Sequence, residues 1–167
     1  EQKKQTTIQI SGKTLKEIIN ATTFAVSRDE LKPALTGVFF QTTEKGIVAV
    51  STDGHRLVKH FRTDHQKNNI SGGVVVPKKF LTYLSTHLKE DSVDLVLAEN
   101  HLAAKVGLDV ILTRIIDEKF PNYESVIPKN NDKKFVIDKE SLLGAIKRVS
   151  IFSNKSTHQV ALSLGPD

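Results

Sequence analysis

One strand-to-helix boundary recurs three times along the chain, and this repetition constrains the fold more than any other feature of the sequence. Each copy opens with a β-branched residue and closes with leucine: Ile10–Leu15, Val76–Leu81 and Ile137–Leu142. A repeat this long indicates duplication of a whole supersecondary unit, not a short-repeat solenoid. The alternative is that any strand followed by a helix gives a similar pattern. If the duplication is real, the first two copies open the two halves of one domain, and the third opens a new domain near residue 133.

The spacing of apolar residues predicts a mixed α+β domain built from two strand–helix–strands halves. Helices are expected over about 13–26, starting at Ser11 or Lys13–Thr14, and over about 78–89, where Pro77 is tolerated at the N-terminus. Strands are expected near residues 5–10, 36–43, 46–52, 56–62, 73–77, 92–98, 101–106 and 109–116. After the third copy, Val160–Leu164 is expected to form a further strand, so that the second domain contributes one helix and parts of two strands.

Composition limits the class of protein. The chain has no cysteine, which excludes disulfides and thiolate zinc sites, and it has neither a signal peptide nor an apolar run long enough to span a membrane. We therefore expect a cytoplasmic protein without membrane contact. Because the first residue is Glu1 and residues 129–167 are too few to bury a core, we expect a fragment that consists of one domain, 1–128, and an incomplete second domain, 129–167.

The run Ser51–Leu57 follows an apolar strand and gathers several reactive side chains around one glycine. Asp53, His55 and His60 have the chemistry of metal ligands, but five residues along a strand place the two histidines on opposite faces. Ser51 with Asp53 and His55 could form a hydrolase site, but the sequence has no Gly-x-Ser-x-Gly elbow. Neither a metal site nor a catalytic residue is therefore expected.

A tight turn is the simplest interpretation of the same run. Gly54 permits a positive φ, and the Asp53 carboxylate can accept hydrogen bonds from nearby backbone N–H groups. His55 and Arg56 would then project from the edge of a sheet beside apolar neighbours, which is a surface suited to docking a peptide.

The charge of the chain, +5 with a pI near 9.4, is compatible with a nucleic-acid partner and equally with an ordinary basic domain. Lysines interleave with Thr and Asn on the polar faces of both predicted helices: Lys13 and Lys16 on the first, Lys78, Lys79 and Lys89 on the second. Such a face can contact phosphates without reading bases, although most lysine-rich helix faces are simply solvated. The sequence has no glycine-rich phosphate loop, and no cofactor is expected.

A set of motifs resembles one family, the beta sliding clamp of bacterial DNA polymerase III. The most specific are Thr52–Leu57 and Phe120–Tyr123, and their order and separation agree with the family; the others are Ala21–Ser27, Leu35–Phe40, Arg114–Asp117 and Val126–Pro128. The resemblance covers the middle clamp domain, roughly residues 5–128, followed by the beginning of the third domain.

The resemblance implies a DNA-clamp fold, with antiparallel sheets outside and two helices on one face. In this family each chain has three similar domains, and two chains close head to tail into a ring around duplex DNA. The implied function is a processivity factor, not an enzyme, acting in the bacterial cytoplasm at the replication fork. The implied partners are duplex DNA, bound without sequence preference, DNA polymerase III and other polymerases, the clamp loader and repair proteins.

The resemblance also implies two sets of site residues. The wall of a partner-peptide pocket is carried over to Leu35, Thr52, Gly54, His55, Arg56, Leu57, Pro121 and Val126. The DNA-facing residues are Lys13, Lys16, Arg28, Lys32, Lys78 and Lys79. Two other functions stay open: a standalone DNA-binding or scaffold domain, and a hydrolase that uses Ser51, Asp53 and His55.

Overall fold

The computed structural model describes residues 6–63 and 72–165, and the chain divides into two compact units, Glu1–Val126 and Ile127–Asp167. Within the described ranges, no helix combines the length and the apolar character needed to cross a membrane.

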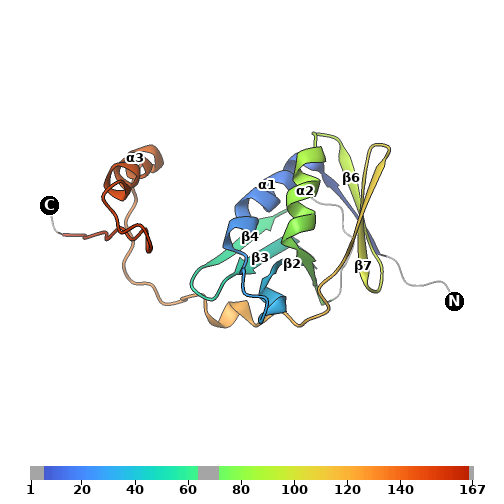
Figure 1. Cartoon of the computed structure of the whole chain (residues 1–167), viewed down its shortest axis with the longest axis horizontal. Coiled ribbons are helices and arrows are strands. Elements are labelled where there is room, and N and C mark those ends of the chain that lie inside the picture. Colours follow the sequence, from blue (N-terminus) through green and yellow to red (C-terminus); the bar gives the residue numbers. More distant parts are fainter. Residues whose placement is uncertain (1–5, 64–71, 166–167) are drawn as a thin grey trace. The chain divides into compact units, whose positions relative to one another are not determined.

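The first unit contains the same sequence of elements twice (Figure 1). The first half runs β1 (Thr6–Ser11), α1 (Gly12–Thr22), the short 3-10 turns η1 (Thr23–Ala25) and η2 (Pro33–Leu35), β2 (Gly37–Thr43), β3 (Gly46–Thr52) and β4 (Leu57–Arg62). The second half runs β5 (Val74–Pro77), α2 (Lys78–His87), β6 (Ser92–Leu97), β7 (His101–Val106) and β8 (Asp109–Arg114). The predicted strand–helix–strands halves are thus both present, and the eight predicted strands of this unit are confirmed to within about two residues at each end.

The two halves exchange their first strands. One sheet has the order β1-β6-β7-β8 and the other β4-β3-β2-β5, and every pairing is antiparallel. β1 therefore completes the sheet of the second half, with Ile8 opposite Leu95, while β5 completes the sheet of the first half, with Val38 opposite Val76. Neither half can form its four-stranded sheet without a strand from the other.

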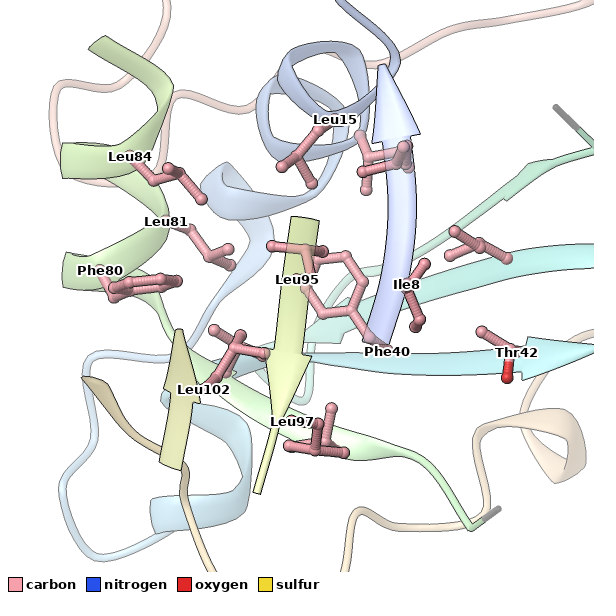
Figure 2. A pocket seen from close by; sticks show the side chains of 15 residues that line it. Ile8, Leu15, Phe40, Thr42, Phe80, Leu81, Leu84, Leu95, Leu97 and Leu102 are labelled. Carbon is pink, nitrogen blue, oxygen red and sulfur yellow. The ribbon is translucent and has the colours of Figure 1, made fainter. Parts of the chain in front are cut away.

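The helices and both sheets share one apolar core. α1 and α2 pack against each other and lie side by side along the sheets (Figure 1). Leu15 of α1 and Leu84 of α2 point into the same space as Ile8 of β1, Phe40 of β2 and Leu102 of β7 (Figure 2). A cavity of about 30 Å³ is left between them, lined almost wholly by aliphatic and aromatic side chains. A void with such a lining offers water too few hydrogen-bond partners.

The first helix is shorter than the predicted 13–26. It starts as expected, because the Ser11 hydroxyl accepts a hydrogen bond from the Thr14 backbone N–H at 3.1 Å. It ends at Thr22 and continues as the 3-10 turn η1. The hydroxyls of Thr22 and Thr23 donate to the carbonyls of Ile18 and Ile19 at 2.8 and 2.9 Å, and such back-bonding competes with regular helical hydrogen bonds.

In the sheet β4-β3-β2-β5, the strand β3 is buried on both faces. β3 is buried along nearly its whole length, which explains its unbroken apolar run. Ile47 and Ala49 face the shared core, whereas Val48 and Val50 pack with Phe120 on the opposite face. The chain after β8 supplies this cover. Ile116 pairs with Val75 beside β5, and the segment then crosses the sheet to η3 (Tyr123–Ser125).

The second unit contains α3 (Lys139–Ser150), where the third copy of the repeat predicts a helix. Its N-cap residue Asp138 accepts a hydrogen bond from the Ser141 backbone N–H at 2.8 Å, as Ser11 does for Thr14. The predicted strand at Val160–Leu164 is wrong, and within the described residues of this unit no strand forms. A β-strand requires a neighbouring strand to satisfy its backbone groups, and these residues provide none.

We predict that Leu84→Ala destabilises the protein by about 3–5 kcal/mol, because Leu84 is completely buried and its truncation enlarges an existing void. Urea denaturation followed by far-UV circular dichroism measures the loss. The matched control is Leu108→Ala, since Leu108 is fully exposed and its truncation removes no core contact. A Leu84→Ala protein as stable as the control would contradict the shared core.

Candidate functional site

The run Thr52–Leu57 forms the predicted turn between β3 and β4. Gly54 has φ of +92°, with open space where a side chain would lie, so the backbone conformation alone requires glycine. One Asp53 carboxylate oxygen accepts from the backbone N–H groups of His55 and Arg56, each at 3.0 Å. The bond from His55, with those from Arg56, holds the pKa of Asp53 below its ordinary value. The Asp53 carboxylate therefore stabilises the backbone of the turn.

Two side chains tie this turn to the end of α1. The Arg56 guanidinium donates through Nη2 to the Phe24 carbonyl at 2.9 Å and through Nε to Asp53 at 3.0 Å, and it lies 5.7 Å from the centre of the Phe24 ring. Behind it, the buried Ser51 hydroxyl donates to the Thr22 carbonyl at 2.6 Å. The exposed turn is thus anchored to the body of the domain.

These contacts overturn the hydrolase alternative. A nucleophilic serine must be reachable by a substrate, and Ser51 is fully buried with its proton committed to a backbone carbonyl. Both oxygens of Asp53 are occupied by His55 and Arg56. Across the described ranges, no three His, Asp or Glu side chains are grouped closely enough to bind a metal ion.

All eight residues of the predicted pocket wall line one pocket of about 410 Å³. η2 contributes Leu35, and the segment around η3 contributes Pro121 and Val126. The end of β3, the turn after it and the start of β4 contribute the other five: Thr52, Gly54, His55, Arg56 and Leu57. Asn122 and Tyr123 also line the pocket. Their motif, Phe120–Tyr123, is one of the family motifs in the sequence, but the sequence alone does not assign these two residues to the wall.

The wall around η3 rests on aromatic contacts. Phe120 stacks on Phe39 of β2 with ring centres 5.0 Å apart, and Tyr123 lies 6.2 Å from the same ring. Burial raises the pKa of Tyr123. On the outer side, the Lys59 ammonium of β4 forms an ion pair with Glu124 and lies 5.5 Å from the centre of the Tyr123 ring. The hydrogen bond to Glu124 raises the pKa of Lys59.

The predicted DNA-facing cations lie on α1, on the loop after it and at the start of α2. Five of them are exposed and Lys78 is half-buried. The loop that carries Arg28 and Lys32 is closed by a hydrogen bond from the Ser27 N–H to the Leu35 carbonyl at 2.9 Å. Lys32 also lies 3.9 Å from the Asp29 carboxylate. The loop therefore runs from the end of α1 directly to the pocket wall.

Family models match both parts of the chain. Residues 9–122 match the central domain of the DNA polymerase III beta subunit, and residues 124–167 match its C-terminal domain. The beta sliding clamp of Pseudomonas putida is 32% identical over 95% of this chain. Because the match covers 44% of that relative, the chain spans less than half of its length.

Solved structures agree with the family models. A DNA polymerase sliding clamp from Bacillus subtilis has a TM-score of 0.82 and 31% identity over 89% of this chain and 40% of its own. A sliding clamp from Bartonella birtlesii bound to griselimycin has a TM-score of 0.78 and 28% identity over 90% of this chain and 42% of its own. The two antiparallel sheets with their adjacent helices are therefore the architecture of solved clamps, and the chain belongs to the family of DNA polymerase III beta subunits.

Proposed function

We propose that this chain is part of a ring-shaped sliding clamp, and that its pocket binds short peptide segments of replication and repair proteins. The observation that carries the proposal is the convergence of Leu35, the 52–57 turn and the 121–126 segment around one pocket. These segments are far apart in sequence, and the fold alone brings them together. A pocket of about 410 Å³ is large enough for one or two large side chains of a peptide.

The chemistry of the pocket favours an apolar peptide with a few polar groups. Leu35, Leu57, Pro121 and Val126 supply apolar walls, and His55 adds an exposed imidazole. Burying one Leu or Phe of a partner would contribute about 1.5–3 kcal/mol. The resemblance to the clamp family implies the occupant, and we assign to the pocket a peptide with Gln and with Leu or Phe, contributed by DNA polymerase III, other polymerases, the clamp loader or repair proteins.

The basic surface of α1 and α2 is assigned to duplex DNA. Lysine and arginine side chains contact phosphates without reading the base sequence, and weak contacts of this kind permit sliding. The ring, closed by head-to-tail pairing of two full-length chains, would hold DNA by topology. The proposed role is that of a processivity factor in the bacterial cytoplasm that carries out no chemical step itself.

Binding to open-ended linear DNA distinguishes part of a clamp from a standalone DNA-binding domain. We predict that the 167-residue chain binds short linear duplex DNA only weakly and that this binding is lost as salt increases, because it cannot encircle the duplex. Fluorescence anisotropy with a labelled duplex at several salt concentrations measures this. Tight binding at physiological salt would instead favour the standalone domain.

We predict that a peptide with Gln, Leu and Phe shifts the backbone amide signals of the pocket residues in an isotope-labelled protein. The shifts should saturate, cluster at Leu35, at 52–57 and at 122–126, and disappear when Leu and Phe of the peptide are replaced by Ala. Leu57→Ala should weaken binding, because Leu57 lines the pocket, whereas Leu112→Ala removes an exposed leucine of β8 and should not. A folded spectrum without shifts at millimolar peptide would contradict the assignment of the pocket.

We predict that Asp53→Ala destabilises the protein by roughly 1 kcal/mol at pH 7, the worth of hydrogen bonds to an ionised group on the surface. Because the folded state lowers the pKa of Asp53, the stability that its charge adds is complete above the ordinary aspartate pKa and is lost as the pH falls through the lowered value. Urea midpoints of wild type and variant should therefore converge in strong acid. If the difference in urea midpoint between wild type and variant were the same at pH 7 and in strong acid, the charge of Asp53 would contribute nothing to stability. Asp109→Ala is the control for an exposed aspartate.

A further inference from the structure

The pocket wall around η3 has weak internal support. η3 has three residues and no N-cap side-chain hydrogen bond, although the Ser125 hydroxyl donates to the Asn122 carbonyl at 2.7 Å. Its backbone hydrogen bonds are long: the Ser125 N–H lies 3.4 Å from the Asn122 carbonyl, and the Val126 N–H lies 3.3 Å from the Tyr123 carbonyl. Val126, which lines the pocket from the end of this turn, is 67% exposed. The backbone hydrogen bonds of this turn are therefore weak, and contacts from outside the turn contribute to its position.

A contact from β4 adds to the packing of Tyr123 near Phe39. Lys59 follows the 52–57 turn on a regular strand, opposite Val50 of the buried strand β3. Its ammonium reaches η3 in two ways, through the ion pair with Glu124 and through its position over the Tyr123 ring. The same lysine thus joins a strand next to one wall of the pocket to the turn that forms the other wall.

We infer that Lys59 is a positioning residue for the peptide pocket, with Glu124 as its partner: the pair holds η3 at the distance from β4 at which Tyr123 and Val126 complete the pocket. This inference rests on the proposed function of the pocket. It adds a residue that does not line the pocket and acts on it through Tyr123 and Glu124.

Lys59 and Glu124 are both partly exposed, so a role in positioning the turn can be distinguished from a role in stabilising the whole fold. The side chains of Lys59 and Glu124 are 34% and 47% exposed, and pairs of that kind add little to the free energy of unfolding. The folded state depends on the shared core, whereas the position of a three-residue turn depends on the few contacts that reach it. Removing the pair should therefore change peptide binding and leave the denaturation midpoint nearly unchanged.

The same pair also affects which peptides the pocket favours. Arg56 is matched by Asp53, and Lys59 is matched by Glu124, so each of these two cations has a carboxylate partner within the chain. An acidic flank of a peptide therefore finds neither Arg56 nor Lys59 unpaired, and a neutral, apolar peptide gives up no ion pair with them. In Glu124→Gln, the Lys59 ammonium loses its carboxylate and should attract an acidic flank, most strongly at low salt.

The test is a double-mutant cycle on the 167-residue chain with the neutral peptide that carries Gln, Leu and Phe. Lys59→Met and Glu124→Gln should each raise the peptide Kd about three- to fivefold, the size expected for an exposed ion pair with a cation–π contact. The Kd of the double variant should be no higher than the higher of the two single-variant Kd values. Lys59→Arg, which keeps both contacts, should restore wild-type affinity, and Lys45→Met, which removes an exposed lysine of the β2–β3 turn, should have no effect.

The outcomes separate the two proposals. Three outcomes would overturn the positioning role and leave the peptide pocket intact. They are a wild-type Kd in both single variants, strictly additive losses of affinity in the double variant, and an equal loss of affinity in Lys45→Met. If the wild-type protein binds no peptide, the proposed function fails, and amide hydrogen exchange without peptide still tests the tie. Exchange at 123–126 should then be faster in Lys59→Met than in Lys59→Arg, and equal exchange rates would overturn the inference.

Discussion

The exchange of first strands between the two halves is the constraint on which the rest of the first unit depends. β1 needs β6, and β5 needs β2, so both sheets and both helices must assemble together. The start of α1 shows how close this assembly is: the Gly12 N–H donates to the Asp91 carbonyl at 2.8 Å, and a Cβ at Gly12 would lie 2.1 Å from the Lys89 carbonyl. The first half is thus built directly against the end of α2, which fixes the two helices side by side.

The pocket follows from the need to cover a strand, β3, that is apolar on both faces. The helices cover the inner face of β3, and Val48 and Val50 on its outer face must be covered by another segment. The chain from Ile116 to Tyr123 provides this cover, anchored by the stack of Phe120 on Phe39. Where the covering segment ends, it leaves a hollow against the 52–57 turn, and that hollow is the pocket.

Local patterns made most of the first unit predictable, and long-range contacts explain what was missed. Strand alternation and the Asp53–Gly54 turn are encoded within a few residues, and both are confirmed. The end of α1 depends on hydroxyls that bond backward, and a strand at Val160–Leu164 depends on neighbours that these residues lack. The tie between Lys59 and Glu124 joins two charges that are unremarkable in sequence, because only the fold brings β4 and η3 together.

The distribution of charge separates the two proposed binding surfaces. At the pocket, Arg56 and Lys59 are each paired with a carboxylate of the same chain, so apolar burial is left to drive peptide binding. The chain has a net charge of +5, and exposed lysines of α1 and α2 carry part of this positive charge. Salt screens exposed charges but affects apolar burial little. In the proposed ring, rising ionic strength would weaken the phosphate contacts and leave a bound partner peptide in place, because the two surfaces depend on different forces.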